Sequence, residues 1–161
     1  MLSVQSNHEH SHPHFKQWPR YRQSHIGRKL EWLSIQLMDA YNGHIEMSDY
    51  LWQYMSDSIT FNSGLPGAEP VRADPKDMLD KMQHFFVSHP SWRVHATNPS
   101  SVVDEESGEA VVFTSSTING FMTDLARERV TKTKWKRTCG QWKLIEHEVL
   151  VGGGLPPATY D

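Results

Sequence analysis

The sequence predicts an α+β domain in which helices cover one face of a curved antiparallel sheet. Two observations carry this prediction. Apolar residues follow mostly helical spacing up to about residue 90, and alternating segments typical of strands follow. The strands come as a block and do not alternate with helices, which argues against a parallel βαβ arrangement. A chain of 161 residues suffices for one ordinary core, so we expect a single domain.

Three helices are predicted in the first half of the chain. The first covers about residues 28–43, where apolar residues recur at helical spacing before a glycine stop. Ser48 is placed to cap a short second helix, and the strand-like segment SITFNSG follows at residues 58–64. The third helix has the strongest start signal, with Asp74 as N-cap and Pro75 at the first helical position.

The second half of the chain reads as four strands. They are expected at about residues 92–104, 109–120, 128–137 and 141–151, separated by turn-forming residues. The last two strands meet at Cys139-Gly140, which predicts a two-residue hairpin turn.

That turn fixes how the last two strands pair. Trp135 then lies opposite Leu144 on the face toward the helices, and Thr133 lies opposite Glu146 on the same face. Glu146 is therefore predicted to face inward, and His147 outward on a lysine-rich surface. A longer turn or a bulge would shift one strand by a residue and bring His147 inside instead.

The two ends of the chain lack the regular spacing of apolar residues that is typical of helices and strands. Residues 1–25 are rich in His, Ser, Gln and Pro and are expected to form a flexible arm, followed by the folded domain at residues 26–151 and a tail at residues 152–161. The alternating histidines of the arm could hold a metal ion loosely. An arm lacks the fixed geometry of a metal site, so we expect no metal.

Composition argues against several classes of partner. A formal net charge of −3 gives no global field that would attract nucleic acid or an anionic membrane surface. No apolar run is long enough to cross a bilayer, so we expect no membrane partner. Cys139 is the only cysteine, which excludes an intrachain disulfide and favours a reducing, cytoplasmic location.

The last hairpin, W-K-R-x-x-G-x-W-K-L at residues 135–144, together with the order of elements, resembles the nuclear-transport-factor-two-like (NTF2-like) superfamily. Within it, the chain is most similar to SnoaL-like cyclases, scytalone dehydratases and small fungal isomerases of secondary metabolism. The resemblance covers about residues 28–151. It implies a cone-shaped fold: a strongly bent antiparallel sheet around one deep pocket, closed by three N-terminal helices.

Compared with scytalone dehydratases, two residues fall at functional positions. Tyr41, in DAYN, matches a pocket tyrosine, and His95, in WRVHATN, matches a catalytic histidine. Strand alternation alone would place Val94 in the core and His95 on the other face. Only the resemblance predicts that the side chain of His95 faces inward.

Other positions depart from the scytalone dehydratase pattern. Asn42 stands where those enzymes have an aspartate, and Phe61 where they have a strand tyrosine. These departures argue against the scytalone dehydratase mechanism for this chain. An acidic residue late in the sheet, as in SnoaL-like cyclases, fits Glu146 better.

The expected function is a cofactor-free isomerase, cyclase or dehydratase that acts by acid–base proton transfer on a small hydrophobic secondary metabolite. The expected catalytic residues are Glu146, His95 and Tyr41. The expected substrate-binding residues are Trp52, Phe61, Phe86, Thr131, Thr133 and Trp135. The alternative is a non-catalytic ligand-binding or dimerisation module of the same fold, and the resemblance implies a homodimer.

Overall fold

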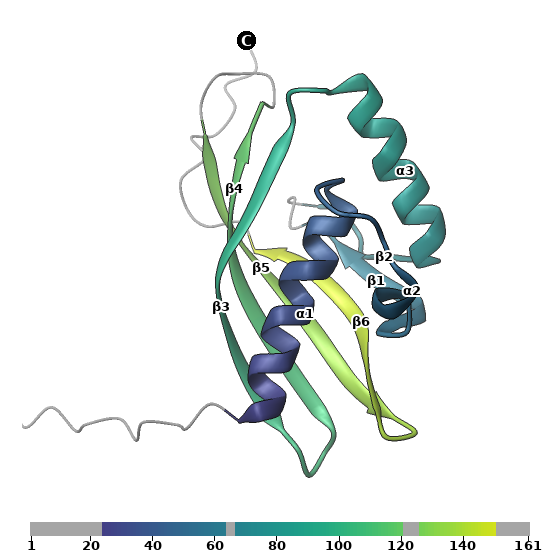
Figure 1. Ribbon diagram of the computed structural model, residues 1–161, viewed down its shortest axis with the longest axis vertical. Coiled ribbons are helices and arrows are strands. Elements are labelled where there is room, and N and C mark those ends of the chain that lie inside the picture. The colour runs from purple at the N-terminus through teal and green to yellow at the C-terminus, as the bar shows by residue number, and fades with distance from the viewer. Residues whose placement is uncertain (1–23, 64–66, 121–125, 151–161) are drawn as a thin grey trace, which may run out of the picture.

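The structure is a computed structural model of the chain, and it describes residues 24–63, 67–120 and 126–150 (Figure 1). In this part of the chain the elements follow in the order α1 (His25–Tyr41), α2 (Asp49–Trp52), β1 (Met55–Asn62), β2 (Val71–Ala73), α3 (Pro75–Ser88), β3 (Arg93–Asp104), β4 (Glu109–Asn119), β5 (Arg127–Thr138) and β6 (Gln141–Leu150). This order confirms the predicted α+β class. The predicted arm and tail lie outside the described residues, except that α1 already begins where the arm was expected to end.

Side-chain caps start each helix. Ser24 accepts a hydrogen bond at 3.0 Å from the backbone N–H three residues on, so α1 begins earlier than its apolar spacing predicted. Ser48 and Asp74 cap α2 and α3, and Pro75 occupies the first turn of α3, as predicted. None of the described helices is both long and apolar enough to span a membrane.

The six described strands form one sheet in the order β2-β1-β6-β5-β4-β3. Neighbouring strands are antiparallel except β1 and β6, which run parallel. The prediction of a wholly antiparallel sheet is therefore wrong at this one pairing. The physical reason is that β1 adds to the free edge of the last strand, and alternation within a strand carries no information about a neighbour's direction. The short strand β2 was not predicted.

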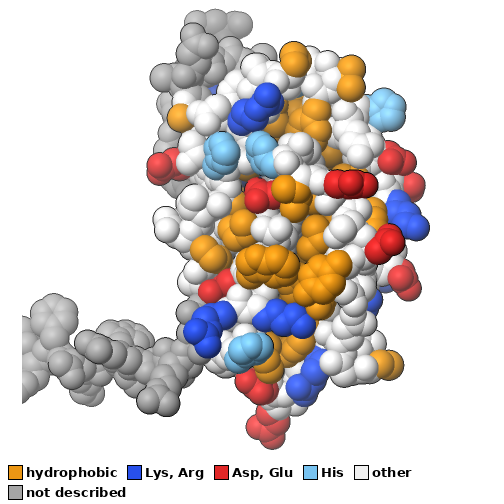
Figure 2. All heavy atoms as spheres, in the orientation of Figure 1, with side chains coloured by type: hydrophobic (Ala, Val, Ile, Leu, Met, Phe, Trp, Pro, Cys, Tyr) orange, Lys and Arg blue, Asp and Glu red, His pale blue; other side chains and the backbone are white. Residues whose placement is uncertain are grey.

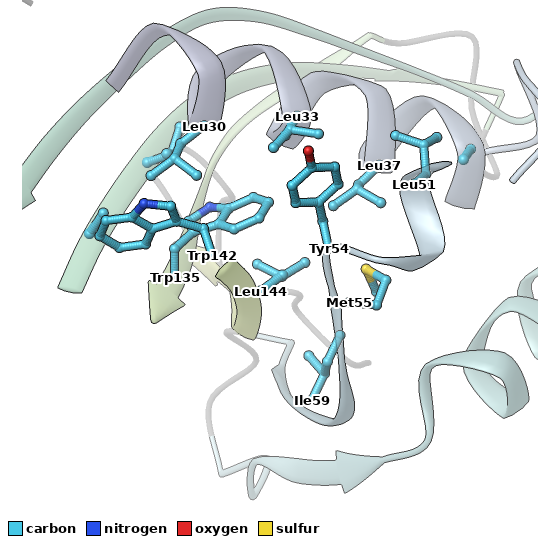
Figure 3. Close-up of a cluster of buried hydrophobic side chains, with 13 residues drawn as sticks. Leu30, Leu33, Leu37, Leu51, Tyr54, Met55, Ile59, Trp135, Trp142 and Leu144 are labelled. Atoms are coloured by element: carbon cyan, nitrogen blue, oxygen red, sulfur yellow. The ribbon is translucent and has the colours of Figure 1, made fainter. Parts of the chain in front are cut away.

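The main core lies between α1 and the inner face of the sheet (Figure 1). Three leucines of α1 at successive turns, Leu30, Leu33 and Leu37, are fully buried or nearly so. They pack toward Trp135 of β5 and Leu144 of β6, as Figure 3 shows. We call the face of the sheet that carries Trp135 and Leu144 the inner face, and the opposite face the outer face.

Two local irregularities interrupt the long strands. The pairing of β3 with β4 shifts between Thr97 and Ser100, around Asn98, whose φ is +50°. The pairing of β5 with β6 shifts at Ile145, which has no partner of its own between Leu144 and Glu146. Extra residues of this kind bend and twist a strand, so they contribute to the curvature of the sheet.

The bulge at Ile145 corrects the predicted faces of β6. The two-residue turn is confirmed, because Cys139 and Gly140 both have positive φ and Thr138 pairs with Gln141. Beyond the bulge, however, Glu146 pairs with Lys134 on the outer face.

His147 pairs with Thr133 on the inner face, so the prediction that Glu146 faces inward and His147 outward is wrong. The bulged register avoids burying carboxylates among threonines, which would be costly, and places one imidazole there instead.

The face that α1 crosses carries an apolar surface area. Trp32 of α1 and Tyr50 of α2 are about half exposed, and their ring centroids lie 6.2 Å apart. Figure 2 shows apolar side chains gathered in the middle of this face, with positive and negative side chains interspersed around them.

Candidate functional site

A band of polar side chains crosses the inner face of the sheet beside the apolar core. Its members come from neighbouring strands and lie opposite one another: Ser116 faces Arg129, Thr114 faces Thr131, and Thr133 faces His147. We call these six residues the polar band. Polar groups on the inner face of a sheet are informative because each needs a partner there.

His147 is the residue of the band best placed for chemistry. Its neighbour on β1 is Phe61, whose ring centroid lies 6.1 Å from that of His147 with the planes tilted by 44°. The side chain is only partly accessible to solvent. Burial and, second, the positive charge of Arg129 lower the pKa of His147 from 6.5 to about 4. His147 is therefore neutral at neutral pH and able to accept a proton.

Arg129 supplies the positive charge of the band. Its Nε donates a long hydrogen bond of 3.4 Å to Ser116 Oγ. Burial lowers the pKa of the guanidinium below its ordinary value, but the group keeps its charge at neutral pH. Within residues 24–63, 67–120 and 126–150 the ion pairs are Lys132–Glu148 and Lys134–Glu146, so Arg129 has no carboxylate partner there.

Two threonines of the band, Thr131 and Thr133, are fixed in position by hydrogen bonds to neighbouring buried residues. Thr133 Oγ1 lies 3.1 Å from Ser34 Oγ of α1 and accepts a hydrogen bond of 3.2 Å from Trp135 Nε1. Thr131 donates to the carbonyl of Thr114 at 3.4 Å. Thr131, Thr133 and Trp135 face inward, as predicted, and each is at most 2% exposed.

Thr114 differs from the other two threonines of the band. Its side chain is 1% exposed, and its Oγ1 has no hydrogen-bond partner among the described residues. A buried hydroxyl without a partner normally costs free energy of folding.

The structure does not bring the three predicted catalytic residues together. Glu146 lies on the outer face, where it accepts a hydrogen bond of 2.9 Å from Lys134 Nζ. Tyr41, at the end of α1, donates a hydrogen bond of 2.7 Å to the carbonyl of Pro75 and so ties α1 to α3. Burial first, and the charge of Asp74 second, raise the pKa of Tyr41.

His95 is exposed on the outer face of β3. Its ring stacks on that of His44, with centroids 5.3 Å apart. The inner face at this point is occupied by Val94, which is 0% exposed. The inward orientation implied by the resemblance is therefore wrong, and the orientation favoured by strand alternation is correct.

The remaining predicted contacts are spread over the domain. Phe61 lies beside His147, as described above. Trp52, at the end of α2, is partly buried, and Lys76 Nζ lies 5.9 Å from the centre of its ring. Phe86 of α3 packs close to Gly43. Among the described residues, no three His, Cys, Asp or Glu side chains gather where they could hold a metal ion.

Sequence reasoning missed Arg129 and Ser116 as members of one site. The alternation in TSSTI and ERVTKT could have indicated that both strands carry polar side chains inward. The pairing that joins them became visible only in the structure.

Comparison with known structures identifies the fold. The Kfla4162 protein from Kribbella flavida aligns with a TM-score of 0.58 and 16% identity, over 75% of this chain and 88% of that one. An NTF2-like protein of unknown function from Pseudomonas putida gives 0.58 at 10% identity, over 77% and 84%. A proposed ketosteroid isomerase from Shewanella frigidimarina gives 0.54 at 11% identity, over 73% and 90%.

The chain therefore has the NTF2-like cone fold, with an open, mixed six-stranded sheet in the part that the structure describes. No protein-family model matches the sequence, and no curated protein matches it. The similarity to known structures establishes the fold alone, because proteins with unrelated functions share this fold. The SnoaL-like branch stays a prediction.

Proposed function

We propose that the chain is a cofactor-independent isomerase, cyclase or dehydratase in which His147 transfers a proton of a small hydrophobic metabolite, such as a polyketide, a terpenoid or an alkaloid. The observation that carries the proposal is the position of His147: an uncharged imidazole on the inner face, next to Phe61 of β1 and within the electrostatic field of the charged Arg129. The fold is consistent with this function, since a proposed ketosteroid isomerase has a similar fold.

The residues suggest a simple proton-transfer step. His147 takes a proton from a carbon atom next to a carbonyl group, and the electron pair of the broken C–H bond moves onto the carbonyl oxygen. The positive charge of Arg129 stabilises the resulting enolate. The imidazolium then returns the proton to another atom of the same molecule, which completes an isomerisation.

The low pKa of His147 in the protein without a bound substrate limits its strength as a base. A negative charge that develops beside Arg129 offsets the field of the guanidinium, which is one of the two causes of that low pKa. The proton affinity of His147 therefore rises as the enolate forms. Stabilisation of this kind grows along the reaction, as catalysis requires.

The test is deuterium exchange into hydrophobic ketones, with and without a carboxylate, in D2O. His147→Gln removes the titrating ring, and Glu146→Gln is the matched control on the outer face. We expect the His147 variant to lose about 100-fold or more of the exchange rate and the Glu146 variant to keep it. Normal exchange by the His147 variant, or no exchange above buffer by the wild-type protein, would refute the proposal.

A non-catalytic binding module is the second candidate. The observation that favours it is again the pKa of about 4, because a general base works best when its pKa is near the working pH. This candidate predicts ligand binding without exchange. Homodimer formation and a cytoplasmic location stay predictions.

A further inference from the structure

We propose that the ligand of this inner site is a hydrophobic monocarboxylate whose negative charge pairs with Arg129. This inference rests on the same site as the proposed function, but it concerns binding and needs no turnover.

The first argument is the charge balance along β5. Lys132 and Lys134 project to the outer face, and each is paired with a glutamate of β6. Arg129 projects to the inner face, where the described residues offer it one hydroxyl, Ser116 Oγ at 3.4 Å. A guanidinium has five N–H donors, and a partly buried charge costs free energy of folding unless an anion or several acceptors compensate it.

The second argument is the position of the nearby carboxylates. Glu146 and Glu148 are the acidic residues of β6, and the bulge at Ile145 directs both away from Arg129. The inner side chain between them is the neutral His147. The fold thus places a cation on the inner face and keeps the neighbouring carboxylates of β6 on the other side. Among the residues that the structure describes, this leaves the position of an anion open to a ligand.

The third argument concerns the rest of the ligand. The inner-face neighbour of His147 on β1 is the ring of Phe61, and that of Thr131 on β6 is Val149. These side chains suit an apolar body, whereas a guanidinium suits a planar carboxylate, which it can bind through two parallel hydrogen bonds. A flat aromatic acid has both features.

The experiment measures binding of 2-naphthoate and of its neutral analogue 2-naphthamide by calorimetry. The wild-type protein should bind the carboxylate about 10-fold to 100-fold more tightly than the amide, as expected for a charge-assisted hydrogen bond. Arg129→Met should abolish this preference, and Arg129→Lys should keep part of it. Lys136→Met is the matched control, because it removes one positive charge from the exposed outer face of the same strand.

Three results would overturn the inference. The first is equal affinity for acid and amide, the second is a preference that survives Arg129→Met, and the third is no binding of 2-naphthoate or of the smaller benzoate. His147→Gln separates this inference from the proposed function: it should keep the preference for the carboxylate even if the wild-type protein exchanges no protons. Thermal unfolding of each variant checks that it is folded.

Discussion

Protonation of the His147 ring should lower the free energy of unfolding of the protein between pH 7 and pH 5. The pKa of the ring is about 4 in the folded protein and 6.5 when unperturbed. In the unfolded chain the ring therefore takes up a proton near pH 6.5, whereas the folded chain resists protonation until about pH 4. The stabilising contribution is fully present above pH 6.5 and is lost as the pH falls to 4. Its total is roughly 3 kcal/mol, of which about 2 kcal/mol is lost by pH 5.

Urea unfolding at pH 7, 6 and 5 tests this prediction when wild type and His147→Gln are compared. The variant cannot titrate at this position, so subtraction cancels the exposed histidines, among them His44 and His95. We expect the stability difference between the two proteins to shift by about 2 kcal/mol against the wild type from pH 7 to pH 5. A stability difference that stays constant with pH would show that His147 is not buried on the inner face within the field of Arg129.

Two further predictions concern the inner face and one tight turn. Thr133→Val should lower the free energy of unfolding by about 1–3 kcal/mol, because it removes the three buried hydrogen bonds of the threonine hydroxyl. Thr114→Val should be neutral or stabilising, because the hydroxyl of Thr114 has no hydrogen-bond partner among the described residues. Urea unfolding ranks the two, and equal losses would contradict the assigned partners. Gly120→Ala should destabilise by well over ~2 kcal/mol, because its Cβ would lie 2.0 Å from the Ser91 carbonyl oxygen, whereas Gly140→Ala, with a similar φ and open space, should cost about 1 kcal/mol. A similar loss at both glycines in thermal unfolding would contradict this packing.

The elements of the fold could be predicted because their signals are local. Ser48 and Asp74 start helices through their own side chains, and Cys139-Gly140 forms a tight turn through its own backbone conformation. Such signals need no knowledge of what packs against them. The direction of β1 beside β6 depends instead on contacts between distant segments, which is why the parallel pairing was missed.

The site could not be predicted to the same extent, because its faces depend on one extra residue. Local alternation placed Thr131, Thr133 and Trp135 correctly. Strand alternation also placed His95 correctly on the outer face. The family resemblance predicted the inner face for His95 and was wrong. For β6 the rule failed, because alternation inverts beyond a bulge and no residue type marks Ile145 as unpaired.

Deletion of Ile145 tests this bulge directly. In the bulged register, Leu144 pairs with Trp135 and Glu146 with Lys134, so removing the unpaired residue leaves every later pairing unchanged. His147 should face inward both in the wild type and in the deletion variant, with a pKa far below 6.5 in both, as measured by NMR titration of the histidine ring. We expect the deletion to cost roughly 1–2 kcal/mol of stability, because it removes a half-buried isoleucine.

The alternative register, without a bulge, makes the opposite prediction for the wild type. Ile145 would then pair with Lys134, and His147 would lie on the outer face with an ordinary pKa. Deleting Ile145 would pull His147 inward, and its pKa would fall only in the variant. An ordinary pKa in the wild type and a low one after deletion would therefore refute the bulge, and with it the assignment of His147 and Arg129 to one site.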